Sequence, residues 1–178
     1  VECSSAVAIP LPDDSASVVL TDPPYYDSIP YADLSDFFYV WLRPILAADY
    51  PDIFVDRETP KATEIVQLAE RNPLYAHKTK EFFEEQMVLA LTEARRVVRP
   101  DGLACIVFAH KTTSGWEALL NAVLKAGWVV TASWPIDTEM VTRFKAIGTA
   151  SLNSSVHLVC RPREHADGSV QRDNVGDW

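Results

Sequence analysis

The tetrapeptide Asp22-Pro23-Pro24-Tyr25 stands directly after the apolar run Ser17–Thr21 and fixes where the chain must leave a sheet. The run is rich in β-branched residues and bounded by turn formers, so it predicts a short buried strand. Proline has no backbone N–H and a fixed φ, and it holds the preceding residue extended, so the strand must end here. The loop then presents one carboxylate, free backbone carbonyls and one aromatic ring.

That combination suits a planar group that carries an NH₂. Asp22 can accept one N–H, a loop carbonyl can accept the other, and Tyr25 can stack on the ring. The plainer interpretation is a Pro-Pro turn that ends a strand and has no functional role.

Apolar segments alternate with segments of helical periodicity along the rest of the chain. We expect strands at Ser17–Thr21, Leu103–Ala109, Trp128–Trp134 and Ser155–Cys160, and helices at Tyr31–Leu46, Ala62–Arg71, Thr79–Val98 and Ser114–Ala126. Asp33 or Ser35 is expected to cap the first helix, and Gly127 to end the last. This order predicts an α/β sheet covered on both faces. The last two strands lack a long helix between them, so an antiparallel hairpin is expected there.

The length of 178 residues, 48% of them hydrophobic, is enough for one core. We expect one domain over residues 1–163, with a polar insertion at about 51–78, and a polar, disordered tail over 164–178. No apolar run reaches 18 residues, so no membrane span is expected. Cys3, Cys105 and Cys160 are widely spaced, which fits reduced thiols in a cytoplasmic protein, and the last two are expected in the core. No metal site is expected.

Asp22-Pro23-Pro24-Tyr25 resembles the (D/N/S)-P-P-(Y/F/W) motif of S-adenosylmethionine-dependent amino-methyltransferases that modify nucleobases. Three longer strings, Thr21–Leu42, Phe108–Lys111 and Ser133–Met140, are similar to the large adenine-specific DNA methylases of bacteria and archaea that carry an N-terminal domain of unknown function. The resemblance runs from about Ala6 to Arg163 and covers only the C-terminal portion of such a protein.

The resemblance implies the second half of a Rossmann-like methyltransferase fold. In that fold the motif follows the fourth strand, an antiparallel hairpin closes the sheet, and ligands bind beyond the carboxyl ends of the strands. It also implies that the site lies at Asp22, Pro23, Pro24 and Tyr25, with S-adenosylmethionine bound beside Asp22 and Pro23. The substrate would be an adenine flipped out of DNA, stacked on Tyr25.

Other residues near the motif and at strand ends are weaker candidates. Tyr26, Asp27 and Tyr31 can line a base pocket or be ordinary loop residues. His110 and Lys111 can contact substrate or cofactor, or simply be a polar strand end. The same alternatives hold for a further wall of the cleft, formed by Trp134, Asp137 and Glu139.

Several further residues are assigned to the fold instead. The aromatic stripe Phe37, Phe38 and Trp41 is expected in the core, and His157 is expected to be structural. The basic group Arg95, Arg96 and Arg99 is expected to be a solvated face at a helix C-terminus.

Charge argues against direct contact between the motif region and DNA. The net charge is −9, and residues 1–55 hold nine acids against one base, Arg43. Phosphate contacts need Lys and Arg. Either another part of the protein binds DNA, or the substrate is different: an amino group in RNA, cytosine or a protein glutamine.

All six glycines lie at or after Gly102, so no Gly-rich turn precedes the motif. In the resembled family that element holds the cofactor and lies upstream, so we expect it before Val1 and expect this chain to be inactive alone. The alternative from another class is a non-catalytic interaction module or split-enzyme half, docked on a partner that supplies the missing strands.

Overall fold

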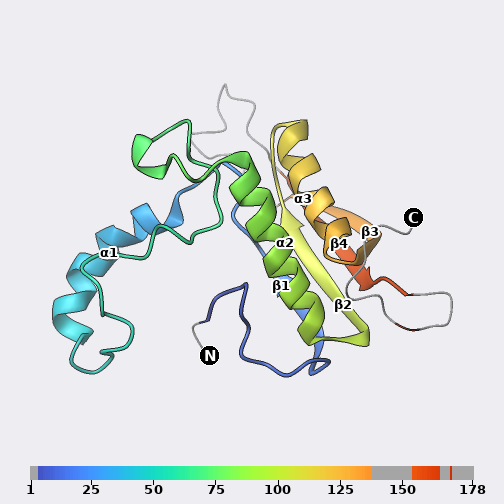
Figure 1. The fold of residues 1–178 in the computed structure, drawn as a ribbon, viewed down its shortest axis with the longest axis horizontal. Coiled ribbons are helices and arrows are strands. Elements are labelled where there is room, and N and C mark those ends of the chain that lie inside the picture. Colours follow the sequence, from blue (N-terminus) through green and yellow to red (C-terminus); the bar gives the residue numbers. More distant parts are fainter. Residues whose placement is uncertain (1–3, 138–153, 165–168, 170–178) are drawn as a thin grey trace.

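The computed structural model describes residues 4–137, 154–164 and 169. Its sheet has the order β1-β2-β4-β3, formed by Ala16–Thr21, Val98–Phe108, Ser154–Pro162 and Trp128–Asp137 (Figure 1). β1 is parallel to β2, whereas β4 is antiparallel to both β2 and β3. The expected α/β sheet with an antiparallel last hairpin is therefore confirmed, in the arrangement implied for the C-terminal part of a Rossmann-like methyltransferase fold. β1, β2 and β3 point the same way, so their carboxyl ends share one edge.

Two helices, α2 (Lys80–Val97) and α3 (Thr113–Lys125), pack together on one face of the sheet (Figure 1). The core between them takes alternate residues of β2 (Ala104, Ile106 and Phe108) together with Phe83, Met87 and Leu91 of α2 and Ala118, Leu119 and Val123 of α3. Gly127 follows α3 with φ of 79°, as expected for the residue that ends it. Thr79, for which no capping role was predicted, caps α2 by accepting from the Phe82 N–H.

The other face of the sheet departs from the prediction. β1 was expected to be buried, but Val18 is 55% exposed and Leu20 72% exposed, while Val19 between them packs against the core. A strand places successive side chains on opposite faces, so Val18 and Leu20 mark the face opposite α2 and α3. In the described residues β1 is an edge strand, paired only with β2. A continuous apolar run indicates that a strand can be buried on both of its faces, but it does not establish that the rest of this chain covers both faces of β1.

Helix α1 spans Tyr31–Leu46, as predicted, but its surroundings differ from the prediction. Neither Asp33 nor Ser35 caps it; the Glu64 carboxylate accepts from the Ala32 N–H instead. Phe37, Phe38 and Trp41 were expected in the core, yet all are exposed and α1 has no buried residue. Helical spacing reveals an apolar stripe but does not say what the stripe faces.

The insertion contains only one short helical segment, η1 (Pro73–Tyr75), and the helix expected at Ala62–Arg71 is wrong. Its backbone bonds to distant segments: Gln67 N–H donates to the Tyr26 carbonyl, and Leu68 and Ala69 N–H donate to the Lys78 carbonyl. Lys78 is fully buried, with Nζ 3.0 Å from the Glu64 carbonyl oxygen and 3.7 Å from its carboxylate. Burial lowers the pKa of Lys78.

The arginines at the end of α2 and the start of β2 do not form a common solvated face. Arg95 is buried, and its Nε donates to the Gly127 carbonyl at 3.0 Å. Arg96 donates to the Leu11 and Ile9 carbonyls and pairs with Asp13 and Glu93, which ties the N-terminal segment to α2. Only Arg99 matches the expectation, paired with Asp101 at the surface.

Cys160 lies in the core and Cys105 is half-buried. Cys3, Glu139 and nearly all of the tail from 164 onward lie outside the described residues. Within the described residues, no helix is both long and apolar enough to cross a membrane.

The attachment of α1 to the insertion should depend on acid pH. Asp36 accepts from Lys61 Nζ at 2.6 Å and from the Thr59 N–H at 2.8 Å, and these bonds lower its pKa to about 2. A lowered folded-state pKa stabilises the contact above the ordinary pKa, and this contribution is lost as pH falls from about 4 towards 2. We expect the Thr59 amide resonance to titrate in this window, and Asp36→Asn to loosen α1 at neutral pH. Asp52→Asn is the control, and a Thr59 midpoint near 4 would contradict the expectation.

Candidate active site in the loop after β1

The loop that follows β1 folds into two tight turns at the carboxyl edge of the sheet. Tyr26 N–H donates to the Pro24 carbonyl at 2.9 Å, and Ser28 N–H donates to the Tyr25 carbonyl at 3.0 Å. Tyr26 has φ of 55°, a left-handed conformation that a residue with a side chain adopts only when its surroundings hold it.

Two acceptors in this loop have no partner within the described part of the chain. Asp22 is exposed and its carboxylate receives no hydrogen bond there. The carbonyl of Pro23, a half-buried residue, receives none there either. The Pro24 carbonyl, by contrast, is occupied by Tyr26 N–H. These free acceptors are the two that the sequence predicted for an amino group.

The two tyrosines of the loop pack inward. Tyr25 is half-buried and meets the Phe108 ring edge-on, with centroids 5.5 Å apart and planes at 73°. Tyr26 lies edge-on to Phe83 at 5.1 Å and to His110 at 5.4 Å. Burial, followed by the charge of Asp27, raises the pKa of Tyr26. Tyr26 therefore anchors the loop to α2 and β2.

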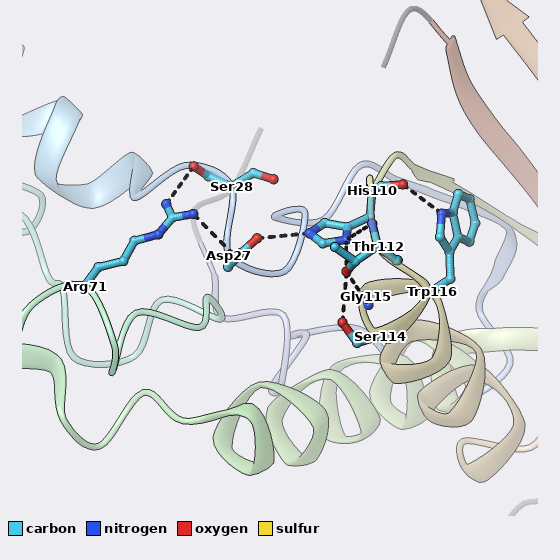
Figure 2. A network of polar contacts seen from close by, with 8 residues as sticks. All are labelled: Asp27, Ser28, Arg71, His110, Thr112, Ser114, Gly115 and Trp116. Atoms are coloured by element: carbon cyan, nitrogen blue, oxygen red, sulfur yellow. Dashed lines mark hydrogen bonds and ion pairs between the residues drawn. The ribbon is translucent and has the colours of Figure 1, made fainter. Parts of the chain in front are cut away.

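Asp27 joins the loop to two other parts of the chain, as Figure 2 shows. One carboxylate oxygen lies 2.9 Å from His110 Nε2, and the other lies 3.2 Å from an Arg71 guanidinium nitrogen. Arg71 also donates to the Ser28 carbonyl at 3.3 Å. The loop is thus fastened to the end of β2 on one side and to the insertion on the other.

His110 is buried, and its surroundings determine its tautomer. Its Nδ1 lies 3.2 Å from the Thr112 backbone nitrogen, whose N–H must donate. Nδ1 is therefore the acceptor, and Nε2 carries the proton that it donates to Asp27. Trp116 Nε1 donates to the His110 carbonyl at 3.0 Å (Figure 2). The imidazole also stacks on the Phe108 ring, with centroids 6.3 Å apart. These bonds commit His110 to holding the loop.

Gly115, in the first turn of α3, lies against the His110 ring. A Cβ at this position would overlap the Nδ1 and Cγ atoms of the imidazole. The close approach of α3 to the ring therefore requires glycine here.

The structure does not bring every predicted site residue to this loop. Lys111 and Tyr31 are exposed, and within the described part of the chain neither side chain bonds to the loop. Trp134 is exposed on β3, which β2 and β4 separate from β1. Asp137 has no described side chain, and Glu139 lies outside the described residues.

Sequence reasoning missed three residues that support the loop: Arg71, Thr112 and Gly115. Arg71 is 44 residues from Asp27, in a segment expected to be helical, so no local pattern links the two. Gly115 carried a usable signal, because glycine in the first turn of a helix often marks a close approach.

A hollow of about 810 Å³ lies between α1 and the insertion and includes Asp33, Lys61, Tyr75 and His77 among its lining residues. Its polar groups bond with one another: Tyr75 Oη donates to Asp33 at 2.6 Å, which raises the pKa of Tyr75 to about 12. No residue of the Asp22–Ser28 loop lines it. Within the described residues, no group of three or more His, Cys, Asp or Glu side chains could hold a metal ion.

Gly115→Ala should displace the His110 ring and thereby release Asp27. Because an added methyl group in a packed site costs about 1–3 kcal/mol, we expect that loss in urea unfolding, with faster amide exchange at Tyr26 and Asp27. Ser114→Ala is the matched control, since it removes only a hydroxyl that contacts Thr112, and should stay within about 0.5 kcal/mol of the wild type. Equal behaviour of the two variants would show that His110 does not position the loop.

Arg71→Ala should loosen the loop with little effect on global stability. The pair with Asp27 is half-exposed, so it contributes less than about 1 kcal/mol. We expect faster amide exchange at Ser28, with only partial rescue by Arg71→Lys, because an ammonium cannot bridge Asp27 and the Ser28 carbonyl as the guanidinium fork does. Arg99→Ala, which breaks another surface pair, is the control. Unchanged exchange at Ser28 in Arg71→Ala would refute the clamp.

No family model matches the chain, and a search of curated proteins also finds no match. Similar solved structures include two of a protein from Thermus thermophilus that is described provisionally as a DNA modification methylase, one of them a selenomethionine derivative. Their identities to this chain are 15% and 13%, with TM-scores of 0.45 and 0.46. The matches cover 88% of this chain but only 48% and 50% of the others, so it spans about half their length. This likeness is too distant to assign an activity or a substrate.

Proposed function

We propose that this chain carries the catalytic loop of an S-adenosylmethionine-dependent methyltransferase that acts on the exocyclic amino group of adenine in DNA. The observation that carries the proposal is the pair of free acceptors, the Asp22 carboxylate and the Pro23 carbonyl, at the carboxyl edge of the sheet. The surrounding loop is held by Asp27 and Tyr26 and leaves these acceptors uncommitted.

An aromatic amino nitrogen is a poor nucleophile because its lone pair is delocalised into the ring. Asp22 and the Pro23 carbonyl would accept its two N–H groups, which draws the nitrogen towards a tetrahedral geometry and localises the lone pair. S-adenosylmethionine supplies the electrophilic methyl group when bound. The methylated ammonium is acidic and loses its proton readily, so the chain need only position the amino group and stabilise its developing charge.

Tyr25 would stack on the adenine after the base leaves the duplex. Its ring is held at one edge by Phe108, which fixes the plane that it presents. His110 and Arg71 act through Asp27 as positioning residues and do not need to touch the base.

The uncovered edge and face of the sheet at β1 are consistent with a further part of the protein, or a partner chain, that packs there. Among the described residues, no strand pairs with the second edge of β1, and Val18 and Leu20 are exposed on the face opposite α2 and α3. Strands and helices supplied by the rest of the protein or by a partner chain would cover both, and would provide the Gly-rich cofactor turn that this chain lacks before Gly102.

The same open edge favours the alternative of a non-catalytic module that docks on a partner. The acidic balance of residues 1–55 keeps a second alternative, an amino group in RNA, cytosine or a protein glutamine, beside adenine in DNA.

Asp22→Ala should strongly slow methyl transfer in the catalytically competent protein. The test compares this chain with a version extended upstream, by calorimetric titration with S-adenosylmethionine and by methyl transfer to an adenine-containing oligonucleotide. We expect binding by the extended protein, and a loss of about 10²–10³ in rate for Asp22→Ala because a preorganised acceptor is removed. Glu117→Gln, at an exposed position of α3, is the control. Full activity in Asp22→Ala, or cofactor binding by neither protein, would overturn the proposal.

A further inference from the structure

Helix α1 is amphipathic, but its polar face packs against the rest of the protein and its apolar face is exposed. Ala32, Asp36, Tyr39 and Arg43 lie on one side at helical spacing. Asp36 bonds to Thr59 and Lys61, and Tyr39 Oη donates to the Asp56 carbonyl at 2.9 Å. These polar contacts fasten the helix to the insertion, and Figure 1 shows α1 standing away from the sheet.

The opposite side of α1 is an apolar ridge that we define by its members Leu34, Phe37, Phe38, Trp41 and Ile45. Their exposed fractions run from 58% for Leu34 to 71% for Ile45. Large side chains can bury about 150–250 Å² each, so the ridge presents on the order of 500 Å² of apolar surface. That value lies at the upper end of the patches that monomers expose, and such patches mark interaction sites.

The end of the ridge is acidic, although it is the C-terminus of a helix. Asp49 and Asp52 follow the last turn and are exposed, and no described residue pairs with either carboxylate. A helix C-terminus carries a partial negative charge and favours cations nearby. The Asp49 carboxylate, close to this helix end, therefore lacks a stabilising cation among the described residues.

The charge of the surrounding segment also limits which kind of molecule could bind the apolar ridge. Residues 1–55 hold nine acids and one base, which repels nucleic acid phosphates and anionic lipid. A second copy would bring two of these acidic segments together, at a net charge of −9 for each chain. A protein surface with both apolar and basic side chains could cover the apolar ridge and pair with the carboxylates of Asp49 and Asp52.

We propose that the apolar ridge of α1 docks a basic amphipathic helix, a protein segment whose apolar stripe is flanked by Lys or Arg. The apolar stripe of the segment would pack against Phe37, Phe38 and Trp41, as apolar anchor residues do when a protein recognises an amphipathic helix. Its flanking cations would meet Asp49 and Asp52.

The test measures binding of a fluorescein-labelled synthetic helical peptide, with Leu at helical spacing and Lys on both flanks, by fluorescence polarisation. A peptide with Glu in place of each Lys is the matched probe. We expect the Lys peptide to bind at least about tenfold more tightly than the Glu peptide. Phe37→Ser/Trp41→Ser should weaken Lys-peptide binding at least about tenfold, because aromatic anchors dominate such interfaces.

Asp49→Asn/Asp52→Asn should weaken binding by about threefold or more and reduce its dependence on salt. The control Glu117→Gln/Leu124→Ser changes an acid and an exposed apolar residue on α3, and should bind as the wild type does. Circular dichroism establishes that each variant is folded, as expected for side chains that face away from the insertion.

The proposal is overturned if Phe37→Ser/Trp41→Ser binds the Lys peptide as the wild type does, or if the two peptides bind equally. It is also overturned if sedimentation shows a dimer that Phe37→Ser/Trp41→Ser dissociates, because a second copy is then the occupant. The assay contains neither S-adenosylmethionine nor DNA, so its failure leaves Asp22 untouched, and a failure of methyl transfer leaves the docking result intact.

Discussion

The Asp27 carboxylate is the interaction on which the geometry of the candidate site depends. It joins three segments that are distant in sequence, because its loop follows β1, His110 follows β2 and Arg71 lies in the insertion. Each oxygen has its own donor, so neither partner competes with the other. The left-handed Tyr26 next to it, which costs of order 1–3 kcal/mol in isolation, is held by the same contacts and by Phe83. Because Asp27 and Tyr26 hold the loop, its conformation does not depend on hydrogen bonds to the Asp22 carboxylate.

Local patterns were sufficient to predict the central elements of the fold. Apolar runs predicted the four strands, and helical periodicity with a Gly127 stop predicted the two helices on the covered face. The antiparallel hairpin followed from the lack of a connecting helix. These features depend on residues close in sequence, which is why they could be predicted.

One error concerns an element itself, the helix expected at Ala62–Arg71, which is absent from the described residues. The other errors concern what each element faces. The spacing of Phe37, Phe38 and Trp41 was correctly interpreted as a helix, yet its polar side faces the protein because Asp36 bonds to the insertion there. Arg95 and Arg96 were assigned to solvent although they cap carbonyls of distant segments. At the site, the motif predicted Asp22 and the Pro23 carbonyl as acceptors, and that role stays a prediction. The support from Arg71 could not be predicted, since it depends on a contact across 44 residues.

The placement of charge in the loop explains how one carboxylate stays available. Asp22 and Asp27 lie in one short segment, and a cation near Asp22 would occupy the lone pairs that an amino group needs. The insertion delivers Arg71 to Asp27, while the exposed Asp22 has no cation within the described residues. The buried His110 donates the Nε2–H of its imidazole to the other carboxylate oxygen of Asp27. That oxygen therefore has a hydrogen-bond donor without a second arginine or lysine. One carboxylate is thereby committed to structure, and its neighbour is kept as an acceptor.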